Sequence, residues 1–393
     1  MTSDLPTRWA WADIELDAVR HNVEVLRSIV APSDVWAVVK ANGYGHGAID
    51  VARAARAGGA DGLCVAFVHE GVELRGAGID APILILSEQP IDAAAEIIEH
   101  RLTPTVYRVE SIEALSSAAV DADVFGYPVH LKVDTGMQRV GAPAGAARSL
   151  AEAIRAASPS LQLQGIFTHL AMADEPDDDF TDLQLVRFDD TLAALTDPSG
   201  SSSEGTELPL VHVANSAGAL AHPATRRSFV RAGIAIYGIS PGRGVDHLCS
   251  ALRPALSLRA RVSFVKRVRA GSRISYGLRH TFERDTVVAT VPIGYADGVS
   301  RRLSTTGGEV LIGGRRRPIV GVVTMDQLMV DCGPDSDVAI GAEVVLIGEQ
   351  DSPDGPQRIR AEDWAGRLDT IGYEVVCGIG PRVPRRTGPN IDF

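Results

Sequence analysis

From about residue 35 to 235 the chain alternates between short apolar segments and longer segments rich in Ala, Glu and Arg. The apolar segments have the length of buried strands, and the intervening segments have the length of helices. Eight strands are predicted at residues 35–39, 62–66, 83–86, 103–107, 129–133, 161–167, 210–213 and 228–231. Helices fit between them, for example at 47–57, 143–157 and 181–195. This pattern predicts an α/β fold with a parallel sheet, and eight strands suit a closed (β/α)8 TIM-like barrel better than an open sheet.

The pattern changes beyond about residue 245, where β-branched residues alternate with polar ones between Gly-rich turns. This texture predicts a mostly-β C-terminal domain. The boundary is predicted in the stretch 240–244, which gives a barrel domain at 1–244 and a β domain at 245–393. Two placements are open for the strand-like segment 9–16, which either precedes the barrel or pairs with the β domain. The Ser- and Gly-rich stretch 197–207 is predicted to be an exposed loop.

Composition and charge exclude several classes of function. The chain has 45% apolar and 22% charged residues, as globular proteins do, and its net charge of −12 argues against a nucleic-acid surface. No apolar run approaches the length of a membrane span, and no secretory signal opens the sequence. The four cysteines are scattered, so their spacing predicts neither a zinc site nor a disulfide framework. We therefore expect a cytoplasmic protein without a metal site.

Polar residues gather where the predicted strands end. In a parallel barrel the carboxyl ends of the strands form one face, and that face carries the active site. The residues at or just after those ends are Lys40, Lys132, Asp134, Arg139, His169, Asn215, Ser216, Arg231 and Gly233, with His212 inside a strand. Each alone has an ordinary structural explanation, such as a salt bridge or a satisfied buried histidine. Their joint placement on one face predicts a binding site there.

Lys40 has the strongest individual signal among these residues. It follows the apolar segment 35–39 and opens a glycine-punctuated turn at 41–47. A lone lysine facing a phosphate-binding turn, with no cluster of metal ligands, fits a Schiff base with pyridoxal phosphate. An aldolase acting on phosphorylated sugars would use similar parts, but it would not need Tyr276 or Tyr373 of the second domain.

Nine blocks of sequence, in order over nearly the whole chain, resemble the alanine racemase family, whose members are pyridoxal-phosphate enzymes of fold type III. The first block, Ala-Val-Val-Lys-Ala-Asn-Gly-Tyr-Gly-His-Gly, is specific by itself, and the others follow at compatible spacing. The blocks are 37–47, 129–141, 167–174, 212–217, 231–238, 275–277, 293–298, 325–327 and 373–377. The resemblance implies an amino-acid racemase that interconverts L- and D-alanine and supplies D-alanine for bacterial peptidoglycan.

The resemblance also implies two catalytic bases and an oligomeric state. Lys40 matches the lysine that forms the internal aldimine with pyridoxal 5′-phosphate and removes the α-proton of D-alanine. Tyr276 matches the second base, which acts on the L-alanine face. Because the partner subunit supplies this tyrosine in the family, the resemblance implies a head-to-tail homodimer with shared active sites.

Other family positions correspond to contacts with the cofactor and the substrate. Those matching the phosphate contacts are Tyr44, Ser216, the backbone of Gly233 and Ile234, and Tyr373. Arg231 matches the arginine at the pyridine nitrogen, and His169 matches the residue that links this arginine to the tyrosine base. Lys132 matches a lysine often carbamylated in the family, where the carbamate orients Arg139 at the cofactor's phenolic oxygen. Residues matching the substrate-carboxylate side are Arg139, Met325 through its backbone N–H, and Tyr295.

Two positions bear on the substrate. Thr324 stands where the family usually has cysteine, so the substrate range or inhibitor sensitivity is expected to differ, whereas the bulk of Tyr373 is kept and favours alanine over serine. The alternatives are a serine or broad-specificity racemase of the same fold, a decarboxylase of a basic amino acid, and a non-catalytic pyridoxal-phosphate carrier. Tyr276 and the block 325–327 argue against the decarboxylase, and a carrier is typically the barrel alone.

Overall fold

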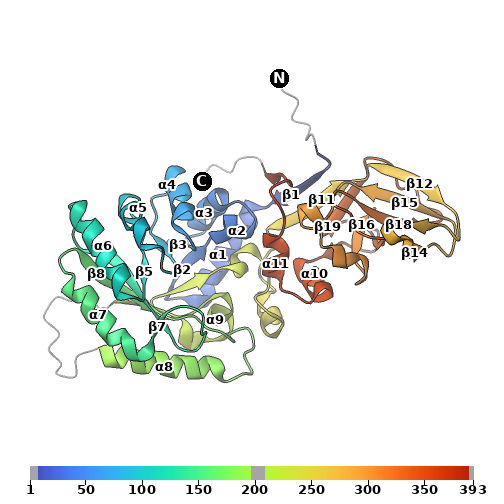
Figure 1. Ribbon diagram of the computed structural model, residues 1–393. Helices are drawn as coiled ribbons and strands as arrows, with labels where there is room; N and C mark the ends of the chain where they lie inside the picture. The colour runs from blue at the N-terminus through green and yellow to red at the C-terminus, as the bar shows by residue number, and fades with distance from the viewer. Residues whose placement is uncertain (1–7, 196–208, 389–393) are drawn as a thin grey trace. The chain divides into compact units, whose positions relative to one another are not determined.

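The computed structural model describes residues 8–195 and 209–388 (Figure 1). The predicted loop 197–207 lies outside these residues. The described chain divides into two compact units. We call residues 17–43 and 47–253 the barrel unit, and residues 8–16, 44–46 and 254–388 the β unit.

Eight parallel strands in the described part of the barrel unit follow one another around a ring. They are β2 (Asp34–Val38), β3 (Gly62–Val65), β4 (Ile83–Ile85), β5 (Thr105–Val106), β6 (Tyr127–Asp134), β8 (Leu161–Phe167), β9 (Leu210–His212) and β10 (Phe229–Ala232). The two-residue strand β7 (Ala142–Pro143) pairs with one of them, β6. Two ladders, β10-β2-β3-β4 and β5-β6-β8-β9, form most of the ring. The bridge between Leu84 and Thr103 joins them on one side, and a 2.8 Å bond from the Ser228 N–H to the Val211 carbonyl joins them on the other. The ring confirms the predicted (β/α)8 barrel.

Helices surround this ring of strands (Figure 1). They are α1 (Leu16–Val30), α3 (Ala48–Ala57), α4 (Val68–Gly76), α5 (Ala94–Glu99), α6 (Val109–Asp121), α7 (Ala147–Ala156), α8 (Phe180–Leu195) and α9 (Ser216–Ala221). In α7, Leu150 and Ile154 are buried at helical spacing, as an amphipathic helix on a core requires. The predicted helix 143–157 is shorter than expected, because Pro143 leads into a 3₁₀ turn, η2 (Ala144–Ala146), before α7 begins.

The β unit is built on a ten-stranded, mostly antiparallel sheet. Its main path is β12 (Phe264–Val268), β15 (Thr286–Val291), β18 (Leu328–Gly333), β17 (Arg315–Val320), β16 (Glu309–Ile312), β19 (Glu343–Gln350), β11 (Leu256–Arg261), β1 (Ala10–Ile14) and β21 (Arg385–Thr387), with β20 (Gln357–Ile359) beside β19. The short pair β13 (Arg273–Ile274) and β14 (His280–Thr281) and the helices α10 (Ala361–Leu368) and α11 (Gly372–Cys377) complete it. A mostly-β second domain is therefore present as predicted.

The strand-like segment 9–16 belongs to the β unit. Its strand β1 pairs antiparallel with β11, with Ala12 opposite Leu258, and parallel with β21, with Ala12 opposite Arg385. The N-terminal strand therefore lies inside the sheet rather than at its edge. This pairing leaves α1 as the first barrel element that follows it in the chain.

The structure divides the chain between residues 253 and 254, about ten residues after the predicted boundary at 240–244. The stretch after that boundary forms the 3₁₀ segment η5 (Arg243–Cys249), in which Val245 is fully buried. The amide of Asn22 in α1 then holds Arg253, donating to its carbonyl at 2.8 Å and accepting from its N–H at 2.7 Å. These contacts keep residues up to 253 with the barrel, although the local composition resembles a linker.

None of the helices in the described ranges combines the length and apolar content that a bilayer span needs. Within the same ranges, no group of three or more His, Cys, Asp or Glu residues is arranged so that it could hold a metal ion.

Candidate active site

Lys40 stands at the start of an unusual backbone turn. It follows strand β2 and begins the short segment α2 (Lys40–Tyr44), in which Ala41 and Asn42 both have φ of 52° and Gly43 has φ of 60°. Tyr44 continues the turn with φ of 51°. These are left-handed conformations, which L-residues with a Cβ atom adopt only at an energetic cost. The turn therefore has to be held by its surroundings.

Hydrogen bonds hold this left-handed turn from both ends. The carboxylate of Glu70 accepts the Ala41 N–H at 2.6 Å, and the Gly43 N–H donates to the Val39 carbonyl at 2.8 Å. The Asn42 side chain accepts the Ala48 N–H at 3.0 Å, so the start of α3 is tied to the same turn. The contact of Glu70 with this turn could not be predicted from the sequence, because nothing in the spacing of Glu70 relates it to Lys40.

Arg231 lies next to the last residue of strand β10 and is buried with several polar partners. One Nη atom lies 2.7 Å from Nδ1 of His212, and the other donates to the carbonyls of Thr168 and Val213 at 2.8 and 2.9 Å. This second Nη atom is also 3.3 Å from Nδ1 of His169. Burial lowers the pKa of Arg231 to about 10, which still leaves it charged near neutral pH. Arg231 and His169 therefore lie within hydrogen-bond distance in the barrel unit.

Lys132 lies on β6 and is almost completely buried. Its Nζ donates to the Leu86 carbonyl at 3.1 Å and lies 5.3 Å from the centre of the Phe167 ring. Burial, together with the charges of Arg231 and Arg139, lowers the pKa of Lys132 to about 7. A lysine in this state has a large neutral fraction near physiological pH.

His169 and Arg139 complete the group at the carboxyl ends of the strands. Burial and then the charge of Arg231 hold the pKa of His169 well below its usual range. Arg139 is exposed in the loop after β6, and its charge acts on both Lys132 and His169. Asp134 organises this loop, because its carboxylate accepts the N–H groups of Gly136 and Gln138 at 2.9 and 3.1 Å.

The turn after β10 brings together the predicted phosphate contacts of the barrel unit. The Ser216 hydroxyl accepts the Gly233 N–H at 2.8 Å and the Ala235 N–H at 3.3 Å. The N–H of Ile234, between them, has no hydrogen-bond acceptor among the described residues. Asn215 caps α9 through the Gly218 N–H at 2.8 Å and so fixes the position of Ser216 at its start.

The β unit brings Tyr44 and Tyr373 together, with ring centres 5.9 Å apart. Arg385 braces the backbone below Tyr44 by donating to the Gly45 carbonyl at 2.9 Å. Gly45 is required there, because a Cβ atom would lie 2.5 Å from the Val376 carbonyl oxygen. Arg385 could not be predicted from the sequence, because its partner lies 340 positions away.

The predicted second base and substrate-side residues lie on exposed turns of the β unit. Tyr276 is 73% exposed, and Tyr295 and Met325 are exposed as well. Tyr295 and Met325 are neighbours, since the Tyr295 N–H donates to the carbonyl of Thr324 at 3.0 Å. The Thr324 hydroxyl closes this turn by donating to the Gln327 carbonyl at 2.8 Å. Thr324 thus has a structural role that a cysteine, a weaker donor, would fill less well.

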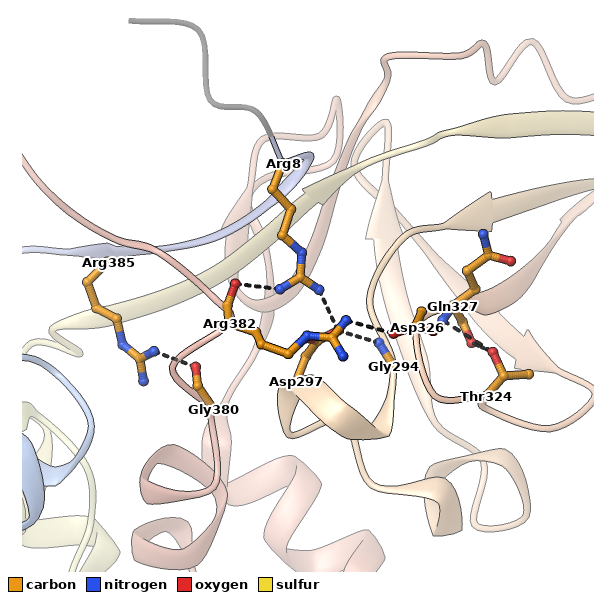
Figure 2. A network of polar contacts seen from close by, with 9 residues as sticks. All are labelled: Arg8, Gly294, Asp297, Thr324, Asp326, Gln327, Gly380, Arg382 and Arg385. Atoms are coloured by element: carbon orange, nitrogen blue, oxygen red, sulfur yellow. Dashed lines mark hydrogen bonds and ion pairs between the residues drawn. The ribbon is translucent and has the colours of Figure 1, made fainter.

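A charged network ties these two turns together (Figure 2). The fully buried Asp297 carboxylate lies 2.5 Å from Arg8 and 3.2 Å from Arg382, and it accepts the Gly294 N–H at 3.0 Å. Arg382 also lies 2.6 Å from Asp326. The network links the turn of Tyr295 to that of Met325. It could not be predicted from local sequence, because its members are far apart in the chain.

The fold and the site together define a class: enzymes with a parallel eight-stranded barrel, a second β domain and a basic site at the carboxyl ends of the barrel strands. Residues 14–241 match the model of the alanine racemase N-terminal domain, and residues 255–387 match that of the C-terminal domain. The chain belongs to the alanine racemase family. The alanine racemase of Symbiobacterium thermophilum is 46% identical to it over 97% of both chains.

Solved structures agree with this assignment. The chain is similar to the alanine racemase of a D-cycloserine-producing Streptomyces lavendulae, with a TM-score of 0.88 and 39% identity over 99% of both chains. It is also similar to a histidine racemase from Leuconostoc mesenteroides, with a TM-score of 0.85 and 28% identity over 98% of this chain and 99% of the other. The shared fold therefore occurs in racemases with different named substrates.

Proposed function

We propose that this protein interconverts L- and D-alanine with the help of pyridoxal 5′-phosphate. The observation that carries the proposal is the position of Lys40 at the end of a barrel strand, in a chain that matches alanine racemases over both domains. Lys40 is the residue that would bind the cofactor covalently.

The charges around the site fit such a cofactor. Three cations, Arg231, Arg139 and Lys40, act on Lys132, and among the charges that act there only Asp134 is negative. An excess of positive charge at this end of the barrel suits a ligand that carries a phosphate and a substrate that carries a carboxylate. When bound, the cofactor delocalises the negative charge that forms as the substrate loses its α-proton.

The residues that match the phosphate contacts of the family would hold the phosphate. In the barrel unit these are Ser216, Gly233 and Ile234, and the unpaired N–H of Ile234 is a donor suited to an anion. In the β unit they are Tyr44 and Tyr373, whose rings are neighbours. Arg231 would face the pyridine nitrogen, and as a donor that stays charged it favours the unprotonated form of that nitrogen.

The proton transfers are assigned to two residues. Lys40 would take or return the proton on the D-face of the substrate α-carbon, and Tyr276 would do so on the L-face. Racemisation needs a proton-transfer group on each face of one planar centre. His169, 3.3 Å from Arg231, is the residue through which Tyr276 would be linked to that arginine.

Arg139, Met325 and Tyr295 would bind the substrate carboxylate. Lys132 is the residue that would carry a carbamate, because its lowered pKa leaves a large neutral fraction of the amine, which can add carbon dioxide with loss of a proton. The carbamate would replace a cation by an anion and hold Arg139 in position.

We infer a homodimer in which each subunit's Tyr276 serves the other subunit's Lys40. The exposure of Tyr276, 73% in a single chain, supports this arrangement. The cellular role that fits is cytoplasmic supply of D-alanine for peptidoglycan.

The proposal is tested by incubating the purified protein, loaded with pyridoxal phosphate, with L-alanine in heavy water. Proton NMR follows the loss of the α-proton signal, and chiral chromatography follows the appearance of D-alanine. We expect equal amounts of both enantiomers at equilibrium, each carrying deuterium at the α-carbon. The Lys40→Ala variant should show neither exchange nor inversion.

Two results would overturn parts of the proposal. Deuterium exchange at the α-carbon without formation of D-alanine would mean that no second proton-transfer group acts on the opposite face. The same assay with L-serine tests the alternative substrate, which is considered because Thr324 stands where the family usually has cysteine. Turnover of serine about ten times faster than that of alanine would identify serine as the substrate.

A further inference from the structure

Arg231 is the first member of a chain of side chains that crosses the interior of the barrel. Its Nη1 lies 2.7 Å from Nδ1 of His212, and Nε2 of His212 lies 2.9 Å from Nδ1 of His130. Nε2 of His130 in turn lies 3.1 Å from the side-chain oxygen of Gln164. Both imidazoles are fully buried, whereas Gln164 is half-buried.

The chemistry of the first member fixes the direction of every bond in this chain. A guanidinium only donates hydrogen bonds, so Nδ1 of His212 has to accept and its proton has to sit on Nε2. That proton is donated to Nδ1 of His130, which therefore carries its own proton on Nε2. The last proton needs an acceptor, and the Gln164 oxygen supplies it. All four groups are satisfied in one arrangement only, with two neutral histidines of the same tautomer.

The histidine rings cannot easily turn out of this arrangement. The His212 ring is stacked between Phe167 and Phe229, with ring centres 4.4 and 4.1 Å away. The His130 ring lies against Gly165, where an added Cβ atom would come within 2.5 Å of the imidazole. Gly165 lies directly across the β6–β8 ladder from His130, so the glycine makes the room that the ring occupies.

Burial keeps the two histidines neutral. It lowers the pKa of His130 to about 4 and holds that of His212 well below its usual range, with the charge of Arg231 acting in the same direction on both. Neutral imidazoles are what the derived tautomers require.

We propose that His130 and Gln164 are positioning residues for Arg231, acting through His212 by locking it in the Nε2–H tautomer. The lone pair of His212 then holds the guanidinium in one orientation. This inference rests on the proposed function, in which Arg231 faces the cofactor ring. Removing the acceptor at position 164 leaves the Nε2–H of His130 buried and unpaired. A switch of His130 to the other tautomer then requires His212 to switch as well, which places its Nδ1–H against the guanidinium of Arg231 and weakens the hold on it.

The test combines a tautomer measurement with kinetics on the holoenzyme. Solid-state ¹⁵N NMR of histidine-labelled protein should report a protonated Nε2 and an unprotonated Nδ1 for His130 and His212. Gln164→Met, which keeps the length but removes the acceptor, should populate the other tautomer. It should also lower kcat for alanine roughly ten-fold, the effect expected from one lost buried hydrogen bond, with little change in KM. Gln164→Glu, which keeps an oxygen acceptor, should restore both.

Gln162→Met is the matched control, since Gln162 lies on the same strand but is exposed, and it should behave as the wild type. A protonated Nδ1 on His212 in the wild type, or unchanged tautomers and kcat in Gln164→Met, would overturn the inference. If Gln164→Met does not fold, the wild-type tautomers and the Gln164→Glu kinetics decide the question. A wild type that shows the derived tautomers but does not racemise alanine contradicts the proposed function and not the tautomer lock.

Discussion

At the scale of single residues, the position of Lys40 depends on a backbone that ordinary residues avoid. Ala41 and Asn42 both have left-handed φ values, and each such residue costs on the order of 1 kcal/mol. Strain of this kind persists where neighbouring groups hold it in place, and it is common beside functional groups. Here the Glu70 carboxylate holds the Ala41 N–H directly after the lysine.

We predict that Glu70→Ala weakens both folding and catalysis. The Glu70 carboxylate also accepts the N–H groups of Ala66 and Phe67 at 2.7 and 3.2 Å, at the start of α4. Losing these bonds should lower the free energy of unfolding by roughly 2 kcal/mol, as measured by urea denaturation. It should also lower kcat several-fold, because the lysine loses its fixed position.

Glu73→Ala is the matched control, because Glu73 lies on the same helix and is exposed. A loss of stability in Glu70→Ala with unchanged kcat would mean that Glu70 only caps α4 and does not position Lys40.

At the scale of elements, the sequence predicts what depends on local pattern. The barrel strands are found because each apolar segment is short and bounded by helix-forming residues, and the lysines, arginines and histidines at their ends follow directly. The predicted strand 103–107 shrinks to β5 (Thr105–Val106), because Pro104 has no N–H to give to the ladder. The left-handed conformation of the turn after Lys40 was not predicted, because its glycines indicate a turn but not the sign of its φ angles.

Interactions between distant segments are not predicted by local pattern. The Asn22 contact with Arg253, which moves the domain boundary, joins residues 231 positions apart. Arg8 and Asp297 form an ion pair although they are also far apart in the sequence, and no repeating pattern of residues predicts that pair. Candidate site residues were therefore predictable where they follow a strand. The distant residues that hold them in place were not predictable.

We predict that the buried histidines of the barrel interior make the protein sensitive to acid. The pKa of His130 is about 4 in the folded state and 6.5 in a model peptide, so between these pH values the unfolded chain binds the extra proton. The free energy of unfolding should therefore fall as the pH drops from 6.5 towards 4, by up to about 1.4 kcal/mol per pH unit for each such histidine. Urea denaturation at about pH 7.5, 6.5 and 5.5 measures this slope.

Replacing His130 with glutamine should make the slope shallower below pH 6.5, because one of the buried titrating groups is gone. His247→Gln, at an exposed position, is the control and should leave the slope unchanged. An unchanged slope in the His130 variant would show that this ring is already protonated, or free to be, in the folded protein.

At the scale of the whole molecule, the proposed catalytic groups are divided between two units. The barrel unit carries Lys40 within its cluster of cations, while the β unit carries Tyr276, Tyr295 and Met325 on exposed turns. Exposed aromatic and methionine side chains are typical of surfaces that another chain covers. A dimer in which each barrel unit receives the β unit of its partner would account for their exposure.

This arrangement predicts that two inactive variants restore activity when they share a dimer. Lys40→Ala and Tyr276→Phe should each be inactive alone, because every site lacks one proton-transfer group. In a mixed dimer one site has lost both groups, but the other combines an intact Lys40 with an intact Tyr276 from the neighbouring chain. Co-expression with two different affinity tags and purification of the doubly tagged dimer should therefore give about half of the wild-type kcat per dimer. If each chain supplied both groups to its own site, every site of the mixed dimer would stay defective, and activity at background level in a verified mixed dimer would rule out the exchange of Tyr276 between subunits.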